Sequence, residues 1–538
     1  MSTGPQPEPD HPPAARYGAK PPVSGTAGMA VTSHPLATRA ARDVLREGGN
    51  ACDAALSAAA VQLVVEPHMT SLTGGLSLLH RSARTGAATY LNGNVNAPLA
   101  PLPDFTGADL SRGRGAPVPG WWPAFDAARR KFGTFGTGRL LAPAIAAATD
   151  GFEVNPFLYG VAYGEQAGLG ASEQMREVFF AEGHLAVPGQ TIRQPRAART
   201  LQRLRDEGMD YYLGDFARAF TSVVQGDGGV ITDRDFEAYR VRVQEPVRGT
   251  YRDTEVVAAP PPDDGGAQLI QALNMLETVD LARLGPPTAS PETLELLIQA
   301  HNTAYYAPPL QRDLSEDRAR LKVLLSKDHA RTRMALLDPG PPPGAAPPSP
   351  GTIHISVVDG AGDIVSLTHS HMASGFVNGL FCEGFQVSGG GSFFQRIMPG
   401  AGQRASIYLA PNIVLRDGRP VIVSGSPSVS LVANVLQNLV NLVDFGMSIE
   451  DSVRAPRFGV RPHTPDRGWQ PGNLLEAGFD AAVVRHVRDW ADRQRLWTRM
   501  VNPWNALCGN FEAIVLDPRT GTARACADPR RVGAAEAA

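Results

Sequence analysis

The feature that most limits the fold of this 538-residue chain is a proline- and glycine-rich segment that runs directly into a strand pattern. Residues 338–351 have few backbone N–H donors and many fixed φ angles, so they can form neither a helix nor a central strand. We expect a solvent-exposed tether there. Two alternating runs, 352–358 and 364–370, then flank a glycine-rich turn, which predicts a β-hairpin.

The alternation of side chains fixes the expected register of this hairpin. Pairing Val358 with Ile364 places Thr352 opposite Ser370, because side chains alternate between the two faces of a strand. The aliphatic face is expected to be core. The other face carries the polar residues Thr352, His354, Ser356, Ser366, Thr368 and Ser370.

A threonine that heads a strand behind an exposed tether has the arrangement that a self-cleaving precursor requires. The Thr352 hydroxyl would attack the Gly351 carbonyl, and an N-to-O acyl shift followed by hydrolysis would free the Thr352 amine. That amine could then act as the base for its own hydroxyl. The hairpin and tether alone leave open that Thr352 merely begins a strand.

Longer motifs resemble the γ-glutamyltransferase family of N-terminal-nucleophile (Ntn) hydrolases, and they cover residues 26–335 and 352–531. The resemblance implies an α+β fold, the four-layer αββα sandwich. It also implies a large fragment, 26–351, and a small fragment, 352–538. The proline-rich composition of residues 1–25 predicts a disordered tail before them. The matching stretches include Ser33–Ala37, Gly48–Ala55, Val65–His68, Leu141–Ile145, Pro260–Gly266, Thr352–Asp359, Leu409–Val414 and Asp528–Arg531.

The resemblance implies roles for individual residues of a catalytic site. Thr352 is expected to be the nucleophile, and Ser370 its hydroxyl partner on the paired strand. The backbone N–H groups of Ser428 and Val429 are expected to stabilise the oxyanion, since every residue except proline keeps that donor.

Other positions depart from the family pattern, and these suggest a changed pocket. Asn94 stands where the family has an arginine that binds the α-carboxylate of a glutamyl substrate. Losing one partner of such a buried charge pair costs roughly 2–5 kcal/mol. Met372, Gln386, Ile407 and Tyr408 also depart from the family pattern and are expected to line the substrate pocket. His354, which the family shares, and Thr368 are expected there because they lie on the same strand face as Thr352.

Three functions remain open on this reading. Thr352, Ser370 and the tether favour a self-processing hydrolase that cleaves an amide or a carbon–carbon bond of a small metabolite. The family includes members of antibiotic pathways, among them those that make 4-alkylproline units, and the lost glutamyl contacts would suit such a role. A conventional γ-glutamyl hydrolase acting on glutathione-like substrates and an unprocessed, inactive binding protein are the alternatives.

The resemblance implies a small-molecule acyl substrate, and the motifs suggest no cofactor. The four cysteines lack the CxxC spacing of metal or redox sites. His369 and His371 could lie on one strand face, but the sequence shows no third metal ligand at a typical spacing from them. A net charge of −3 gives no electrostatic footprint for nucleic acid or an anionic membrane. Residues 1–22 are polar and proline-rich, without the apolar core of a secretory signal, so we expect a cytoplasmic protein.

Overall fold

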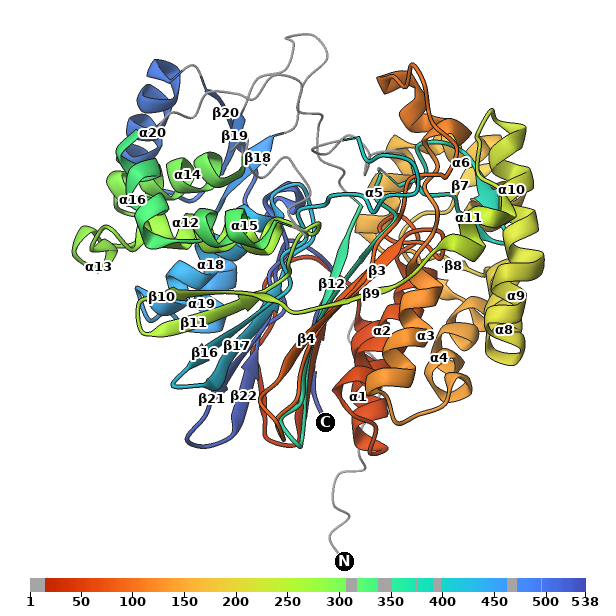
Figure 1. Cartoon of the computed structure of the whole chain (residues 1–538), viewed down its shortest axis with the longest axis horizontal. Coiled ribbons are helices and arrows are strands. Elements are labelled where there is room, and N and C mark those ends of the chain that lie inside the picture. Colours follow the sequence, from red (N-terminus) through yellow and green to blue (C-terminus); the bar gives the residue numbers. More distant parts are fainter. Residues whose placement is uncertain are drawn as a thin grey trace, which may run out of the picture.

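Two central sheets and two outer helical layers make up the fold. The computed structural model describes residues 15–305, 317–336, 351–373, 375–389, 398–461, 472–494 and 496–538. Two seven-stranded sheets lie face to face, and helices cover the outer face of each (Figure 1). This arrangement confirms the expected α+β, four-layer sandwich.

Neighbouring strands are antiparallel in both sheets. The first sheet has the order β1 (Val23–Gly25), β22 (Thr522–Ala525), β21 (Glu512–Asp517), β17 (Arg419–Gly425), β16 (Asn412–Arg416), β11 (Thr254–Ala258) and β10 (Val247–Tyr251). The second sheet has the order β23 (Ala534–Ala537), β2 (Gly28–Thr32), β12 (Ile353–Asp359), β13 (Ile364–Ser370), β3 (Gly75–Arg81), β4 (Ala88–Gly93) and β9 (Arg242–Gln244).

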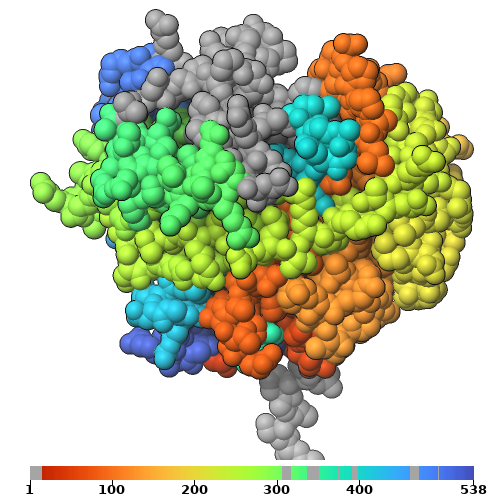
Figure 2. Space-filling view, viewed as in Figure 1, coloured from red at the N-terminus to blue at the C-terminus, as the bar shows by residue number. Residues whose placement is uncertain are grey.

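Each sheet interleaves strands from the two sides of Gly351. In the second sheet, β12 pairs with β2 and β13 pairs with β3, so the hairpin lies between strands of the preceding chain. In the first sheet, β16 pairs with β11, and β22 pairs with β1. Residues before Gly351 also supply most of the surface in the view of Figure 2. The two expected fragments therefore share one fold.

The hairpin has the predicted register. Val358 pairs with Ile364, and His354 pairs with Thr368. The polar face points at the first sheet, where Ser356 Oγ donates to Glu512 O at 2.8 Å and Ser366 Oγ donates to Ser424 O at 3.0 Å. The aliphatic face belongs to the core beneath the helices.

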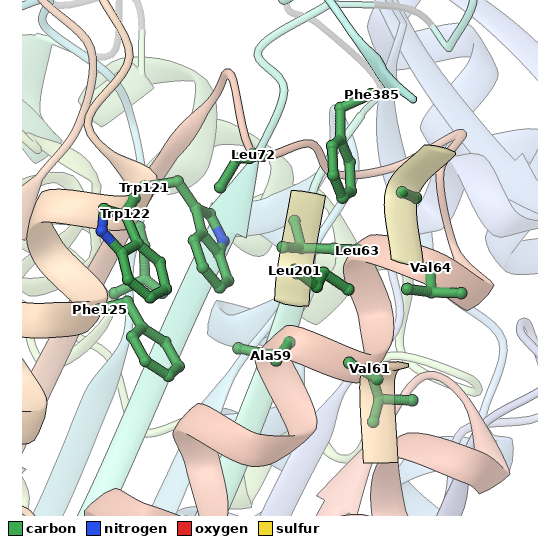
Figure 3. Close-up of a cluster of buried hydrophobic side chains, with 14 of the residues drawn as sticks. Ala59, Val61, Leu63, Val64, Leu72, Trp121, Trp122, Phe125, Leu201 and Phe385 are labelled. Carbon is green, nitrogen blue, oxygen red and sulfur yellow. The ribbon is translucent and has the colours of Figure 1, made fainter. Parts of the chain in front are cut away.

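Helix α2 (Ala51–Val65) forms the centre of that core, and every one of its residues is buried. Asn50 and Asp53 close a capping box at its start, which satisfies backbone N–H groups that would otherwise lack partners. A helix that is apolar on all sides needs cover on all sides. Figure 3 shows Leu63 and Val64 of α2 in a cluster that includes Trp121 and Leu201 of neighbouring elements.

The remaining helices form the outer layers and their extensions. Those on the side of the second sheet are α1 (Pro35–Arg46), α2, α3 (Trp121–Phe132), α4 (Thr137–Asp150), α5 (Pro156–Gly164), α6 (Gln166–Ala171), α7 (Glu173–Phe179), α8 (Pro195–Glu207), α9 (Met209–Tyr211), α10 (Ala217–Gly226) and α11 (Asp233–Ala238). Those on the side of the first sheet are α12 (Gly265–Leu276), α13 (Leu281–Leu284), α14 (Pro291–Tyr305), α15 (Arg318–Leu324), α16 (Lys327–Leu336), α18 (Leu431–Val443), α19 (Ile449–Arg454) and α20 (Ala481–Arg493).

Short strands lie outside the two main sheets. They are β14 (Phe381–Cys382) with β15 (Phe385–Gln386), β5 (Phe152–Glu153) with β8 (Thr191–Ile192), β6 (Phe180–Ala181) with β7 (His184–Leu185), and β18 (Phe458–Arg461), β19 (Gly472–Glu476) and β20 (Trp497–Val501).

The amino-terminal segment is ordered further toward its start than the expected tail over residues 1–25. Val23 of β1 pairs with Ala525, and Lys20 Nζ donates to the carbonyl of Asp528 at 2.8 Å. Backbone pairing and the hydrogen bonds of the partly buried Lys20 ammonium group hold this segment in place, although it is rich in proline. Residues 1–14 and the expected tether over 338–350 lie outside the described residues.

Across the part of the chain that the structure describes, no helix has the length and apolar character needed to cross a membrane.

Candidate active site

Two hydroxyl groups meet at the peptide bond that precedes Thr352. Thr352 Oγ1 lies 2.7 Å from the carbonyl oxygen of Gly351 and 3.2 Å from Ser370 Oγ. Ser370 Oγ donates to the same Gly351 oxygen and accepts from the Met372 N–H at 2.8 Å. The carbonyl is therefore polarised by a hydroxyl from β13 and lies within reach of the threonine hydroxyl.

Gly351 fills a space that only glycine can occupy. A Cβ at this position would come within 2.3 Å of His371 Cε1 and 2.4 Å of the Ala373 carbonyl oxygen. His371 Nδ1 accepts from the Ala373 N–H, so Nε2 carries the proton that is donated to the His68 carbonyl at 2.9 Å. Burial lowers the pKa of His371 to about 4. The neutral imidazole of His371 therefore packs directly against Gly351 and the peptide bond that follows it.

Arg531 holds the other side of Thr352, a role that the sequence reasoning missed. Its Nη1 donates to the Thr352 carbonyl at 3.0 Å, and its guanidinium lies 4.9 Å from the centre of the Phe157 ring. Buried Glu66 and Glu512 face this guanidinium and favour its charged form, although burial raises the pKa of the Glu512 carboxyl well above its usual range. Burial raises the pKa of Glu66 to about 7, although Arg531 and the Ser33 hydroxyl favour its ionised form.

The sequence did contain a signal for Arg531. Arg531 ends the Asp528–Arg531 motif, which matches the family pattern and is rich in charged residues. Charged residues are rarely buried unless they are paired, and in the structure these form a buried ion cluster.

His354 and Thr368, which were expected to line the pocket, bind each other between the sheets. His354 Nδ1 lies 2.9 Å from Thr368 Oγ1, and its Nε2 lies 3.1 Å from Ser356 Oγ. A Cβ at Gly425 would approach the ring to 2.2 Å, so the imidazole is packed tightly against β17. Burial lowers its pKa to about 3. The geometry gives this pair a packing role beside Thr352.

Asn94 and Met372 lie together next to Ser370. Gly75 pairs with Ser370 across the sheet, and a Cβ on Gly75 would meet Asn94 Oδ1 at 2.7 Å and Met372 Cε at 3.1 Å. Asn94 Nδ2 donates to Asp263 Oδ1 at 2.6 Å. Asp263 was not recognised from the sequence, although it follows three prolines in the matched Pro260–Gly266 motif.

Gln386, Ile407 and Tyr408 hold the loops that surround these residues. Gln386 Oε1 accepts from the Phe376 N–H at 2.8 Å, and its carbonyl accepts from the Ser71 and Thr73 hydroxyls at 2.5 Å each. The Ile407 carbonyl accepts from the Asp264 N–H at 2.7 Å, and the Tyr408 ring lies 5.7 Å from that of Tyr305. All three are buried framework residues.

Ser428 adopts a backbone conformation that glycine adopts more easily. Its φ is +87°, and its Oγ donates to the Leu507 carbonyl at 3.3 Å and accepts from the Ser430 N–H at 3.0 Å. β17 ends at Gly425, which packs against the His354 ring, and Ser428 and Val429 lie in the loop that follows. Two side-chain hydrogen bonds hold Ser428 in this strained turn.

The strain at Ser428 leads to a testable difference between two substitutions. Ser428→Ala loses both hydrogen bonds and keeps the strained φ, whereas Ser428→Gly loses them and removes the strain of roughly 1–2 kcal/mol. We expect the glycine variant to be the more stable of the two by about 1 kcal/mol. Thermal melts of both purified variants measure this, and an alanine variant that melts higher would contradict the assigned loop geometry.

The histidine pair His369 and His371 is divided between two hydrogen-bond networks. His369 Nε2 lies 2.9 Å from Gln62 Oε1, and its Nδ1 accepts from the Trp121 indole N–H at 3.1 Å. No group of three metal-binding side chains occurs among the described residues.

Comparisons with known proteins match the chain over most of its length. The Gamma-glutamyltranspeptidase family model matches residues 37–538. The Acylase ACY 1 proenzyme of Pseudomonas sp. (strain SE83) is 30% identical over 495 residues, covering 85% of each chain. The Glutathione hydrolase proenzyme of Escherichia coli (strain K12) is 28% identical over 563 residues, covering 95% of this chain and 92% of the relative. Cephalosporin acylase from Bacillus halodurans has a similar fold, with a TM-score of 0.81 and 23% identity over 99% of both chains.

Proposed function

Because the chain belongs to the γ-glutamyltranspeptidase family, whose members are Ntn-type enzymes, we propose that it is a self-processing threonine hydrolase with a diverged specificity. The observation that supports this most directly is the meeting of the Thr352 and Ser370 hydroxyls at the Gly351 carbonyl. The names of the relatives as proenzymes agree with processing.

Self-processing would proceed through these groups in two steps. Thr352 Oγ1 attacks the Gly351 carbonyl carbon, and Ser370 Oγ donates to the oxygen as it gains charge. The C–N bond then breaks, the nitrogen takes up a proton, and an ester joins Gly351 to the Thr352 oxygen. Water hydrolyses that ester to a Gly351 carboxylate and a Thr352 with both a free hydroxyl and a free amine.

Turnover would use the same hydroxyl on an external substrate. The new amine of Thr352 accepts the hydroxyl proton as Oγ1 attacks the acyl carbonyl, and the leaving group departs with that proton. Water then hydrolyses the Thr352 ester, which releases the acid and restores the hydroxyl. We assign the oxyanion donors of this step to the N–H groups of Ser428 and Val429. Arg531 keeps Thr352 in place through its carbonyl.

The substrate is proposed to be a small acyl metabolite, cleaved at an amide or at a carbon–carbon bond beside a carbonyl. The acylase relative at 30% identity supports cleavage of an acyl group. A role in specialised antibiotic metabolism and a cytoplasmic location belong to the same proposal, and four free, buried cysteines suit a reducing compartment. The glutathione hydrolase relative supports the alternative of a conventional γ-glutamyl hydrolase.

The direct test of processing is the size of the purified protein on a denaturing gel. A cut before Thr352 divides the 538 residues into fragments of 351 and 187 residues, and the smaller one begins Thr-Ile-His. A single intact chain would contradict the proposed function.

Specificity is tested with a chromogenic γ-glutamyl anilide. Asn94 lacks the charge to bind an α-carboxylate, and it is already engaged with Asp263. Losing such a contact costs roughly 2–5 kcal/mol, so we expect kcat/KM at least about 30-fold below that of the E. coli glutathione hydrolase. The two enzymes are assayed side by side after complete processing. Comparable turnover would favour the conventional γ-glutamyl alternative.

A further inference from the structure

The amino-terminal arm, residues 15–25, binds the segment 528–531 near the other end of the chain. Lys20 Nζ donates to the carbonyl of Asp528 at 2.8 Å and to the carbonyl of Arg531 at 2.5 Å. Both of these acceptor residues are buried. A buried carbonyl that loses its donor is costly, and a charged donor makes the stronger hydrogen bond. The ammonium group therefore holds the backbone of this segment at two points.

The arm is fixed on both sides of Lys20. The Gly18 N–H donates to the Pro529 carbonyl at 3.1 Å, and β1 pairs with β22 along its whole length. Arg454 Nη2 donates to the Lys20 carbonyl at 2.9 Å. The arm is thus an ordered part of the fold, although it precedes residues 37–538, over which the family model matches.

Arg531 connects the arm with Thr352. Its carbonyl accepts from Lys20, while its Nη1 donates to the Thr352 carbonyl at 3.0 Å. Tyr17 of the arm packs edge-on against the Phe157 ring, with 6.4 Å between the ring centres. The Arg531 guanidinium lies 4.9 Å from the centre of the same ring. The arm therefore contacts Arg531 through its backbone and shares a packing partner with its side chain.

The contact between Arg531 and Thr352 depends on where the Arg531 backbone is held. Buried Glu66 and Glu512 also face the guanidinium, so it has alternative acceptors if that backbone moves. Hydrogen bonds between charged groups are stronger than those to a neutral carbonyl. Anchoring the Thr352 carbonyl also fixes the hydroxyl and the amine of the same residue. A donor that holds the Arg531 backbone therefore bears on the position of both groups.

We propose that Lys20 is a positioning residue for the threonine chemistry: it holds the backbone of Arg531 so that the guanidinium binds the Thr352 carbonyl. Lys20 itself touches no reacting atom. The inference rests on the proposed function, because it requires that Thr352 attacks Gly351. A misplacement of about 1 Å caused by a substitution far from the chemistry can slow a reaction about 10²-fold.

The test measures self-cleavage of freshly translated precursor on a denaturing gel. Lys20→Met keeps the aliphatic stem and removes the ammonium group, so we expect cleavage about 10- to 100-fold slower than in wild type. Lys20→Arg keeps a cation that can donate to both carbonyls and should recover the rate to within about threefold. Lys327→Met is the matched control, because this half-buried ammonium also donates to a backbone carbonyl, that of Thr250 at 2.5 Å. It should cleave at the wild-type rate even if its melting temperature falls.

A double-mutant cycle separates positioning through Arg531 from a general loss of stability. Arg531→Lys keeps a positive charge beside Glu66 and Glu512 but lacks the fork of donors, so it should itself slow cleavage about tenfold or more. If Lys20 acts through Arg531, adding Lys20→Met to Arg531→Lys should slow cleavage by about twofold at most. Melting temperatures show which variants fold. If Lys20→Met does not, Lys20→Gln, which keeps a neutral donor, takes its place in both comparisons.

Three results would overturn the inference: Lys20→Met cleaving as fast as Lys327→Met, Lys20→Arg cleaving as slowly as Lys20→Met, or the full effect of Lys20→Met persisting beside Arg531→Lys. Failure of the proposed function is a different result. It would appear as a wild-type chain that stays uncut on the same gel.

Discussion

Replacing Thr352 with alanine is expected to leave the protein as one intact 538-residue band and to remove its hydrolase activity. The substitution removes the only atom of this residue that can attack Gly351, and the amine that would serve as base is never released. Loss of a nucleophile that acts as a unit with its base typically costs activity by factors on the order of 10⁴ or more. A denaturing gel over several days and an acyl-hydrolysis assay measure both effects.

Thr352→Ser is the control for this experiment. It keeps a hydroxyl at the same position, so fragments of 351 and 187 residues should still form, at a lower rate. Cleavage of Thr352→Ala at the same position as wild type would show that another group or a contaminating protease cuts the chain. Activity without cleavage would separate catalysis from processing and refute the proposed base.

Ser370→Ala is expected to slow self-cleavage by about 10²- to 10³-fold. Its hydroxyl donates to the oxygen that becomes negatively charged when Thr352 attacks, and removing one such donor from an oxyanion site has an effect of this size. The rate is followed from freshly translated precursor on a gel. Ser370→Thr retains a hydroxyl and should recover much of the rate.

A matched control lies on the same strand and the same face. Ser366 donates to the Ser424 carbonyl, so Ser366→Ala removes a buried hydroxyl with a comparable burial cost at some distance from Gly351. It should cleave at nearly the wild-type rate. If Ser366→Ala and Ser370→Ala slowed self-cleavage equally, the cause would be general destabilisation of the hairpin. That result would contradict the role of Ser370 in polarising the Gly351 carbonyl.

The contact between Thr352 and Ser370 could be predicted, because it follows from the alternation of side chains along a single β-hairpin. The pairing of Val358 with Ile364 already implies that Thr352 meets Ser370, and the structure has both features. Helix α2 was predictable for a similar reason, since an apolar run without a polar face has to be buried.

The rest of the site depends on contacts that local patterns do not encode. Asp263 reaches Asn94 over 169 positions, and Arg531 reaches Thr352 over 179. Neither hydrophobic period nor turn chemistry specifies such a pairing. Alternation along a strand predicts which face a side chain occupies, but not how far it lies from the catalytic residue. His354 was therefore expected in the pocket, whereas its ring is held by Thr368 and Ser356.

The interleaving of strands across Gly351 would make the proposed processing irreversible for the folded protein. Before the cut, every strand belongs to one chain, and refolding after heat or denaturant is a unimolecular process. After the cut, β12 and β13 must find β2 and β3 on a separate polypeptide, so recovery depends on concentration and competes with aggregation of exposed strand edges. The mature protein would then persist through slow unfolding, and heat-inactivated samples should regain less activity the more they are diluted.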